Sequence, residues 1–140
     1  MNIVDYNDKK FLESEAFKEF IKNNPSKGYL NIRAYAANQA IPVSGLKVIV
    51  SKDIDNNKVI FYEGLTDNSG LINSISLPAP SINKDDTLIP NVIKYDVEAK
   101  YEKDNIDLFF KINIYSNINV YQNINIVPDI RLWNGGIYGN

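Results

Sequence analysis

The strongest constraint on the fold is a repeated pattern of strand and turn between Gly28 and Leu77. Short runs rich in Leu, Ile, Val, Phe and Tyr are separated there by polar turns, the sharpest of which is Thr66–Gly70. β-branched and aromatic residues favour strands, whereas Asp, Asn, Ser and Gly favour tight turns. Short strands of this kind bury one apolar face each, so the pattern predicts a sandwich of two antiparallel sheets.

Alternation with a period of two continues from Phe110 to Ile126 almost without a break. One strand of that length would be unusual, so we expect a bend near Ser116, with an odd number of loop residues. This register would place Ile114 and Ile118 on the same face. The sequence therefore predicts a seven-stranded antiparallel sandwich, mainly β, over residues 28–128.

The odd-numbered positions of this stretch, from Asn113 through Asn125, are occupied by asparagine and tyrosine. Two interpretations are open. Amides beside phenol rings can bind a sugar by hydrogen bonding and stacking. The same residues also suit an outer sheet face, or an edge strand that pairs with a neighbour.

One helix is predicted, over residues 11–23. Its apolar residues recur at helical spacing, and Asn24 and Pro25 end it. We expect either that this helix packs on the sandwich or that residues 1–27 form an arm on another subunit. Residues 129–140 would form a second arm, because this glycine-rich segment is too short to enclose its own aromatic side chains. The predicted partner contacts of the two arms are Phe11, Phe17, Phe20, Ile21, Trp133, Ile137 and Tyr138.

Composition argues against catalysis. The chain contains neither histidine nor cysteine, which removes the commonest general base, a thiolate nucleophile and the commonest transition-metal ligands. The segment from Asp53 to Asn57 resembles the start of a calcium loop. However, Lys58 stands where such a loop needs glycine, and Gly64 stands where it needs a bidentate glutamate. We therefore predict a non-enzymatic protein with no cofactor and no metal.

Charge and hydropathy also limit the partners. The formal net charge of the 140 residues is −2, and no basic block points to nucleic acid. No apolar run approaches the roughly 20 residues that span a bilayer, so we expect no membrane partner. The first residues lack the pattern of a signal peptide, which predicts synthesis in the cytoplasm.

Two turn residues have a predicted structural role. Asp67 can accept hydrogen bonds from the backbone of its own turn, and Gly70 can supply a positive φ that other residues resist.

Taken in order, these motifs resemble the carboxypeptidase-regulatory-like (transthyretin-like) β-sandwich family, and within it the non-catalytic N-terminal module of bacterial spore cortex-lytic enzymes. The resemblance rests on LNIRAY (30–35), AIPVSGLKV (40–48), GLTDNSG (64–70), LPAP (77–80), YDVEAK (95–100) and INIVP (124–128). It implies an Ig/transthyretin-like sandwich used as a passive module. Members of this fold that hydrolyse a urate-pathway intermediate rely on histidines, which this chain lacks.

Two functions are therefore expected. The first is a structural subunit of a large particle assembled in the cytoplasm, such as a phage tail, a tail-like bacteriocin or a spore-wall assembly, with other protein subunits as partners. The second is an accessory module that binds carbohydrate or cell wall.

Overall fold

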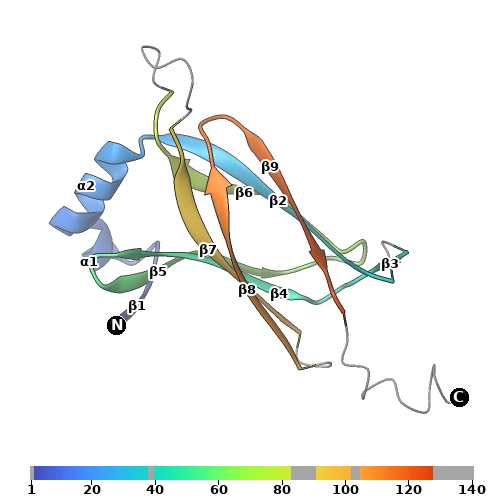
Figure 1. Cartoon of the computed structure of the whole chain (residues 1–140). Coiled ribbons are helices and arrows are strands. Elements are labelled where there is room, and N and C mark those ends of the chain that lie inside the picture. Colours follow the sequence, from blue (N-terminus) through green and yellow to red (C-terminus); the bar gives the residue numbers. More distant parts are fainter. Residues whose placement is uncertain (1, 38–39, 83–90, 102–104, 128–140) are drawn as a thin grey trace, which may run out of the picture.

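Two β-sheets form the body of the protein in the computed structural model, which describes residues 2–37, 40–82, 91–101 and 105–127 (Figure 1). Sheet A has the strand order β1-β5-β4-β7-β8, and sheet B has the order β3-β2-β6, with β9 also paired to β2. The strands of sheet A are β1 (Asn2–Asp5), β4 (Lys47–Ile54), β5 (Asn57–Leu65), β7 (Ile93–Tyr101) and β8 (Ile106–Ile114). Those of sheet B are β2 (Ser26–Ala36), β3 (Ile41–Pro42), β6 (Leu71–Ala79) and β9 (Asn119–Asn125).

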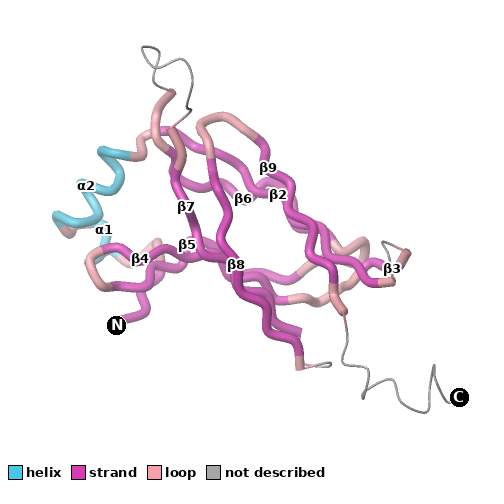
Figure 2. Tube along the Cα trace, in the orientation of Figure 1, coloured by secondary structure: helices cyan, strands magenta, loops and turns pink. Residues whose placement is uncertain are grey.

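The prediction of a mainly β sandwich is confirmed, but the strand number and the purely antiparallel pairing are wrong (Figure 2). The described residues contain nine strands rather than seven. The two shortest, β1 and β3, have four and two residues, which is too few to show a period of two. Two pairs, β1–β5 and β2–β9, are parallel. Parallel partners are joined by long connections, so no local turn signal announces them.

The core lies between the inward faces of the two sheets. Leu30, Ile32 and Ala34 of β2 face Val48, Val50 and other buried side chains of sheet A. Tyr95 of β7 is also buried, and its hydroxyl donates a hydrogen bond to the Pro78 carbonyl oxygen of β6. This bond joins the two sheets through the core.

Helical structure is confined to the N-terminal part of the described chain, where α1 (Lys9–Leu12) and α2 (Glu15–Asn23) replace the single predicted helix. Asp8 caps the start of α1, and Ser14, which lies between the two helices, caps the start of α2, because each side chain accepts a backbone N–H of the turn that follows it. Both helices lie at one end of the sandwich (Figure 1).

The aromatic side chains of these helices belong to the core of the domain. Phe11, Phe17 and Phe20 are buried in the same cluster as the sandwich residues. The Phe20 ring lies 5.7 Å from that of Phe61 in β5, and Phe61 lies 5.3 Å from Tyr95. The helix therefore packs on the sandwich, and the alternative of an arm docked on another subunit is wrong for these three side chains.

The connection between β8 and β9 also differs from the prediction. It has four residues, 115–118, rather than an odd number, and it carries the chain from sheet A to sheet B. Ile114 is buried, whereas Ile118 is 49% exposed, so the two do not share an environment. A crossing between sheets is not bound by the register rules of a hairpin, which explains the error.

Candidate binding face

The turn from Thr66 to Gly70 is held by its own residues. The Asp67 carboxylate accepts the backbone N–H groups of Ser69 at 2.8 Å and Leu71 at 3.0 Å. Gly70 has a φ of +76°, and a Cβ added there would lie 2.3 Å from the Ala34 carbonyl oxygen. Asp67 and Gly70, the two residues with a predicted structural role, therefore both make contacts within the turn. These contacts fix the turn beside the end of β2.

Parallel pairing of β2 with β9 brings together two polar segments that are far apart in the sequence (Figure 1). Tyr29 lies opposite Asn119, and Tyr35 lies opposite Asn125. The odd-numbered residues of both strands point to the same side, away from the buried Leu30, Ile32 and Ala34. We call this surface the binding face, and it consists of Tyr29, Asn31, Arg33, Tyr35, Asn119, Tyr121, Asn123 and Asn125.

Asn31 holds the binding face to both neighbouring strands. Its side-chain oxygen accepts the Ser74 backbone N–H of β6 at 2.9 Å. Its amide nitrogen donates to the Asn119 side chain and to the Val120 carbonyl oxygen of β9, both at 3.4 Å. Only 8% of Asn31 is exposed, whereas 75% of Tyr121 is exposed. Asn31 thus positions the face, and Tyr121 is available to a ligand.

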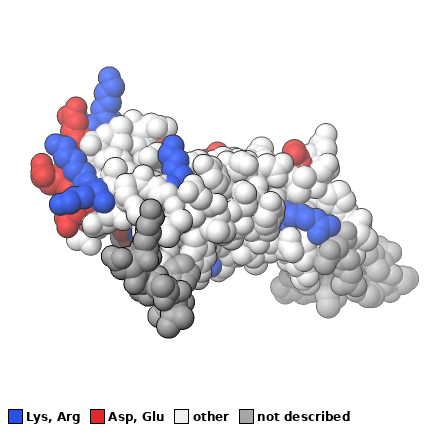
Figure 3. All heavy atoms as spheres, turned by 90° about the horizontal axis from the view of Figure 1, so that it is seen from above, with Lys and Arg blue, Asp and Glu red and all other residues white. Residues whose placement is uncertain are grey.

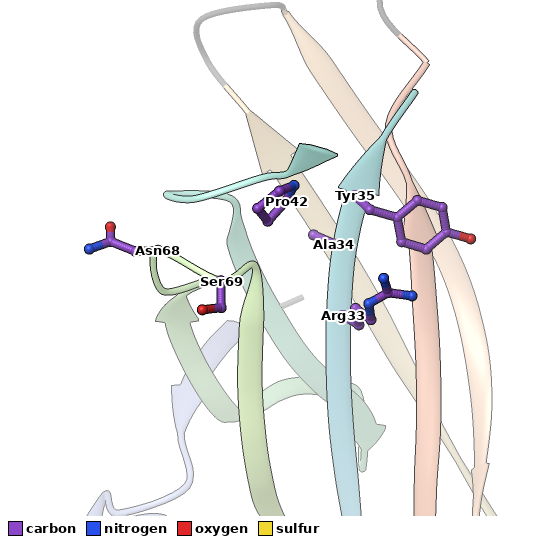
Figure 4. A pocket seen from close by; sticks show the side chains of 6 residues that line it. All are labelled: Arg33, Ala34, Tyr35, Pro42, Asn68 and Ser69. Atoms are coloured by element: carbon purple, nitrogen blue, oxygen red, sulfur yellow. The ribbon is translucent and has the colours of Figure 1, made fainter. Parts of the chain in front are cut away.

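A small pocket of about 240 Å³ adjoins this face at the end of β2 (Figure 4). Its polar and ring-bearing lining residues are Arg33, Tyr35, Pro42, Asn68 and Ser69. The Arg33 guanidinium lies 5.0 Å from the centre of the Tyr35 ring, within the range of a cation–π contact. The residues that line the pocket therefore include a cation, a phenol ring, an amide and a hydroxyl, of which the Arg33 and Tyr35 side chains lie on the other side of β2 from Asn68 and Ser69 (Figure 4).

Ion pairs concentrate on sheet A. Lys111 of β8 pairs with Asp96 of β7 at 2.7 Å, and Lys47 of β4 pairs with Glu63 of β5 at 3.1 Å. The binding face carries one charged side chain, Arg33. In the view of Figure 3, charged side chains gather over one end of the molecule, and the middle is mostly uncharged. A ligand of the face would thus be recognised by hydrogen bonds and ring contacts.

Displaced pKa values also occur on the strands of sheet A. Burial raises the pKa of Tyr95 and of Tyr62. Burial lowers the pKa of Lys52, whose ammonium donates to the Lys94 carbonyl oxygen at 2.8 Å. A hydrogen bond to Asp96 raises the pKa of Lys111. Each shift has a structural cause, which is burial for Tyr95, Tyr62 and Lys52 and the Asp96 hydrogen bond for Lys111.

The calcium-like segment is a hairpin turn. Asp55 and Asn56 have φ values of 50° and 60°, and they join β4 to β5 in a tight two-residue loop. Within the described residues, no group of three or more Asp, Glu, His or Cys side chains could hold a metal ion. None of the described helices has the length and apolar character needed to cross a membrane.

The partner contacts predicted from the sequence do not gather on one surface. Phe11, Phe17 and Phe20 are buried in the core, and Ile21 is partly buried against it. The remaining three, Trp133, Ile137 and Tyr138, lie outside the described residues. The sequence placed the alternate residues of β2 on a polar face, but not beside β9. No sequence signal indicates that parallel neighbour.

Comparisons with known proteins found distant structural neighbours and no match in sequence. No family model matches the sequence, and no curated protein matches it. The chain is similar to Klebsiella pneumoniae 5-hydroxyisourate hydrolase at 13% identity and a TM-score of 0.48, over 73% of this chain and 91% of the other. It is similar to (S)-allantoin synthase at 10% identity and a TM-score of 0.43, over 71% and 41%.

Both TM-scores lie below 0.5, and neither likeness says what this chain does. The resemblance to the spore cortex-lytic module finds no support in these comparisons.

Proposed function

We propose that this protein is a non-catalytic interaction module that joins other protein subunits through the binding face. The observation that carries the proposal is the pairing of β2 with β9, which gathers tyrosine, asparagine and arginine on one exposed surface. Tyrosine offers a large contact area at low entropic cost, and asparagine offers adaptable hydrogen bonds, as in antibody combining sites. Tyrosine and arginine are also enriched at protein interfaces in general.

The non-catalytic part of the proposal rests on chemistry. A general base or nucleophile needs a partner that adjusts its pKa within a cleft. The chain has no histidine and no cysteine. Among the described residues, burial raises the pKa of Tyr95 most strongly, and this side chain lies in the core, bonded to a backbone carbonyl. We further propose that the module acts as a subunit of a large particle, in which it would contact other proteins.

The test compares two exposed aromatic residues on different sheets. Tyr121 lies on the binding face, and Phe109 of β8 is similarly exposed on sheet A. In native cells, we expect the tagged wild-type chain and the Phe109→Ser variant to sediment with other proteins as a large assembly. The Tyr121→Ser variant should sediment without those proteins while keeping the wild-type melting curve. Equal sedimentation of both variants with the assembly would refute the role of this face.

A carbohydrate-binding module is the second candidate. The pocket beside Arg33 and Tyr35 favours it, because residues that bear an amide, a hydroxyl and a phenol ring are among those that line it. Retention of the purified chain on wall glycan, lost in Tyr35→Ala and kept in Phe109→Ser, would support this candidate. If the chain is retained in this way but sediments alone in native cells, the glycan function replaces the subunit function.

A further inference from the structure

We infer that β1 is an exchangeable strand, and that the edge of β5 accepts β1 of a second copy of this chain in place of its own. This exchange goes beyond the proposed function and does not depend on it, because β5 belongs to sheet A and the binding face lies on sheet B.

The pairing of β1 shows what the edge of β5 binds (Figure 1). All four residues of β1 pair in parallel with the first four residues of β5, and Val4 lies opposite Val59. The Tyr6 N–H extends this ladder by donating to the Ile60 carbonyl oxygen at 2.9 Å. Val59 is buried, and Val4 is partly buried against the core. The edge therefore takes a parallel strand that places an apolar side chain against the core.

Few side chains hold β1 in place. Three of its four residues are exposed, and Ile3 is 69% exposed. Val4 and Tyr6 pack against the core, and the Tyr6 ring centre lies 4.6 Å from that of Phe61. Among the described strands, β1 pairs with β5 alone. Segments with few buried contacts open at a lower free energy than the core, so β1 should separate from β5 while the two sheets stay folded.

A single turn joins β1 to the helices. The Asp8 N–H donates to the Asp5 carbonyl oxygen at 2.9 Å, and the Asn7 N–H donates to the Asp5 carboxylate at 2.8 Å. The chain is anchored again directly after this turn, because Asp8 caps α1 and Phe11 is buried in the core. Opening of the turn therefore frees residues 2–6 as one segment and leaves the helices in place.

The β1 strand of a second copy brings the contacts that the chain's own β1 gives up. Exchange of an identical segment restores the pairing with β5 and the ring contact of Tyr6 with Phe61, and it gives up the two hydrogen bonds of the Asp5 turn. A short flexible tether holds the chain's own β1 at an effective concentration of about millimolar. A second copy should therefore compete for the edge at millimolar chain concentration.

Cysteine cross-linking tests the exchange, because the chain has no cysteine of its own. Ile3 and Lys58 lie opposite each other in the pairing of β1 with β5. The double variant Ile3→Cys, Lys58→Cys should close a disulfide within one chain at micromolar concentration and keep the mass of one chain. This result would show that the two positions are neighbours in the register of β1 and β5.

Exchange between copies is tested by mixing two full-length single variants, Ile3→Cys and Lys58→Cys, at millimolar concentration under mild oxidation. Cross-linked pairs with one chain of each kind should exceed pairs of like chains at least about tenfold, because an exchanged β1 brings the two different cysteines within disulfide distance. In the matched control, Glu63→Cys replaces Lys58→Cys. Glu63 lies on β5 beyond the residues that pair with β1, so this mixture should show no excess over random cross-linking.

A proline variant tests whether the excess requires strand pairing. Backbone groups alternate along a strand, so Val4 turns its N–H toward β5 as Tyr6 does. Proline has no N–H to donate. Adding Val4→Pro to the Ile3→Cys chain should therefore abolish the excess of mixed pairs.

Three results would overturn the inference. They are random proportions in the mixture of Ile3→Cys and Lys58→Cys, an excess that survives Val4→Pro, and a folded double variant that cannot close its internal disulfide. If a variant does not fold, the wild-type chain decides. In a millimolar mixture of isotope-labelled and unlabelled wild-type chains, isotope-filtered NMR should show contacts between Val4 of one copy and Val59 of another. Absence of these contacts would refute the exchange.

Discussion

At the residue scale, Gly70 combines a backbone requirement with a steric one. Its φ is +76°, and an added Cβ would lie 2.3 Å from the Ala34 carbonyl oxygen. Gly45 has a similar φ of +80°, but a Cβ there would meet nothing within 4 Å. We expect Gly45→Ala to cost about 1 kcal/mol for the positive φ alone. Gly70→Ala should cost about 2 kcal/mol or more, because the clash is added.

Urea unfolding of the two glycine variants measures this difference. Equal costs would mean that the turn can move away from β2 without loss. A stable Gly70→Ala variant that no longer binds its partners would instead make the turn a contact site.

Tyr95 carries a second prediction at this scale. Its hydroxyl donates to the Pro78 carbonyl oxygen inside the core, where water cannot replace it. Tyr95→Phe keeps the ring but leaves a buried acceptor unpaired, so we expect a loss of about 1 to 3 kcal/mol in unfolding free energy. Tyr121→Phe removes an exposed hydroxyl and should leave the thermal melting curve unchanged. If both variants melt like the wild type, the bond between the sheets contributes nothing to stability.

At the element scale, α2 is part of the folded core. Phe17 is buried among aromatic rings, with Phe11 at 5.0 Å and Tyr6 at 5.8 Å between ring centres. Phe17→Ala should lower the unfolding free energy by about 3 to 5 kcal/mol, because it leaves a cavity under the helix. Lys18→Ala, at an exposed site on the same helix, should change it little. A Phe17→Ala variant that keeps its stability but loses its partners would restore the arm interpretation.

At the scale of the whole molecule, the two sheets of the described residues enclose a core of their own. Its buried side chains extend from Phe11 to Ile126. We therefore expect deletion of residues 130–140 to leave the melting temperature nearly unchanged. The deletion removes Trp133, Ile137 and Tyr138, and buried aromatic side chains often contribute about 2 kcal/mol or more to binding. The truncated chain should thus fold but join its assembly poorly.

Melting curves and sedimentation in native cells, compared with the full chain, measure this effect. Unfolding of the truncated chain would show that the tail belongs to the core, and normal assembly would remove the tail from the contacts.

The sequence by itself determined the sandwich class, the polar turn at Asp67 and Gly70, and the alternation that buries Leu30, Ile32 and Ala34. These features are local, because period, turn chemistry and positive φ are properties of neighbouring residues. The helix signal was also local, since its apolar stripe has the spacing of α2. The apolar stripe alone did not indicate which surface of the protein buries it.

Only the tertiary structure decided which segments meet. It placed Phe20 against Phe61, bonded Tyr95 to Pro78, and set β9 parallel to β2. The binding face depends on that parallel pairing, because half of its residues come from each strand. Such contacts join residues separated by many positions, and their geometry is fixed by how the two sheets close over a shared core.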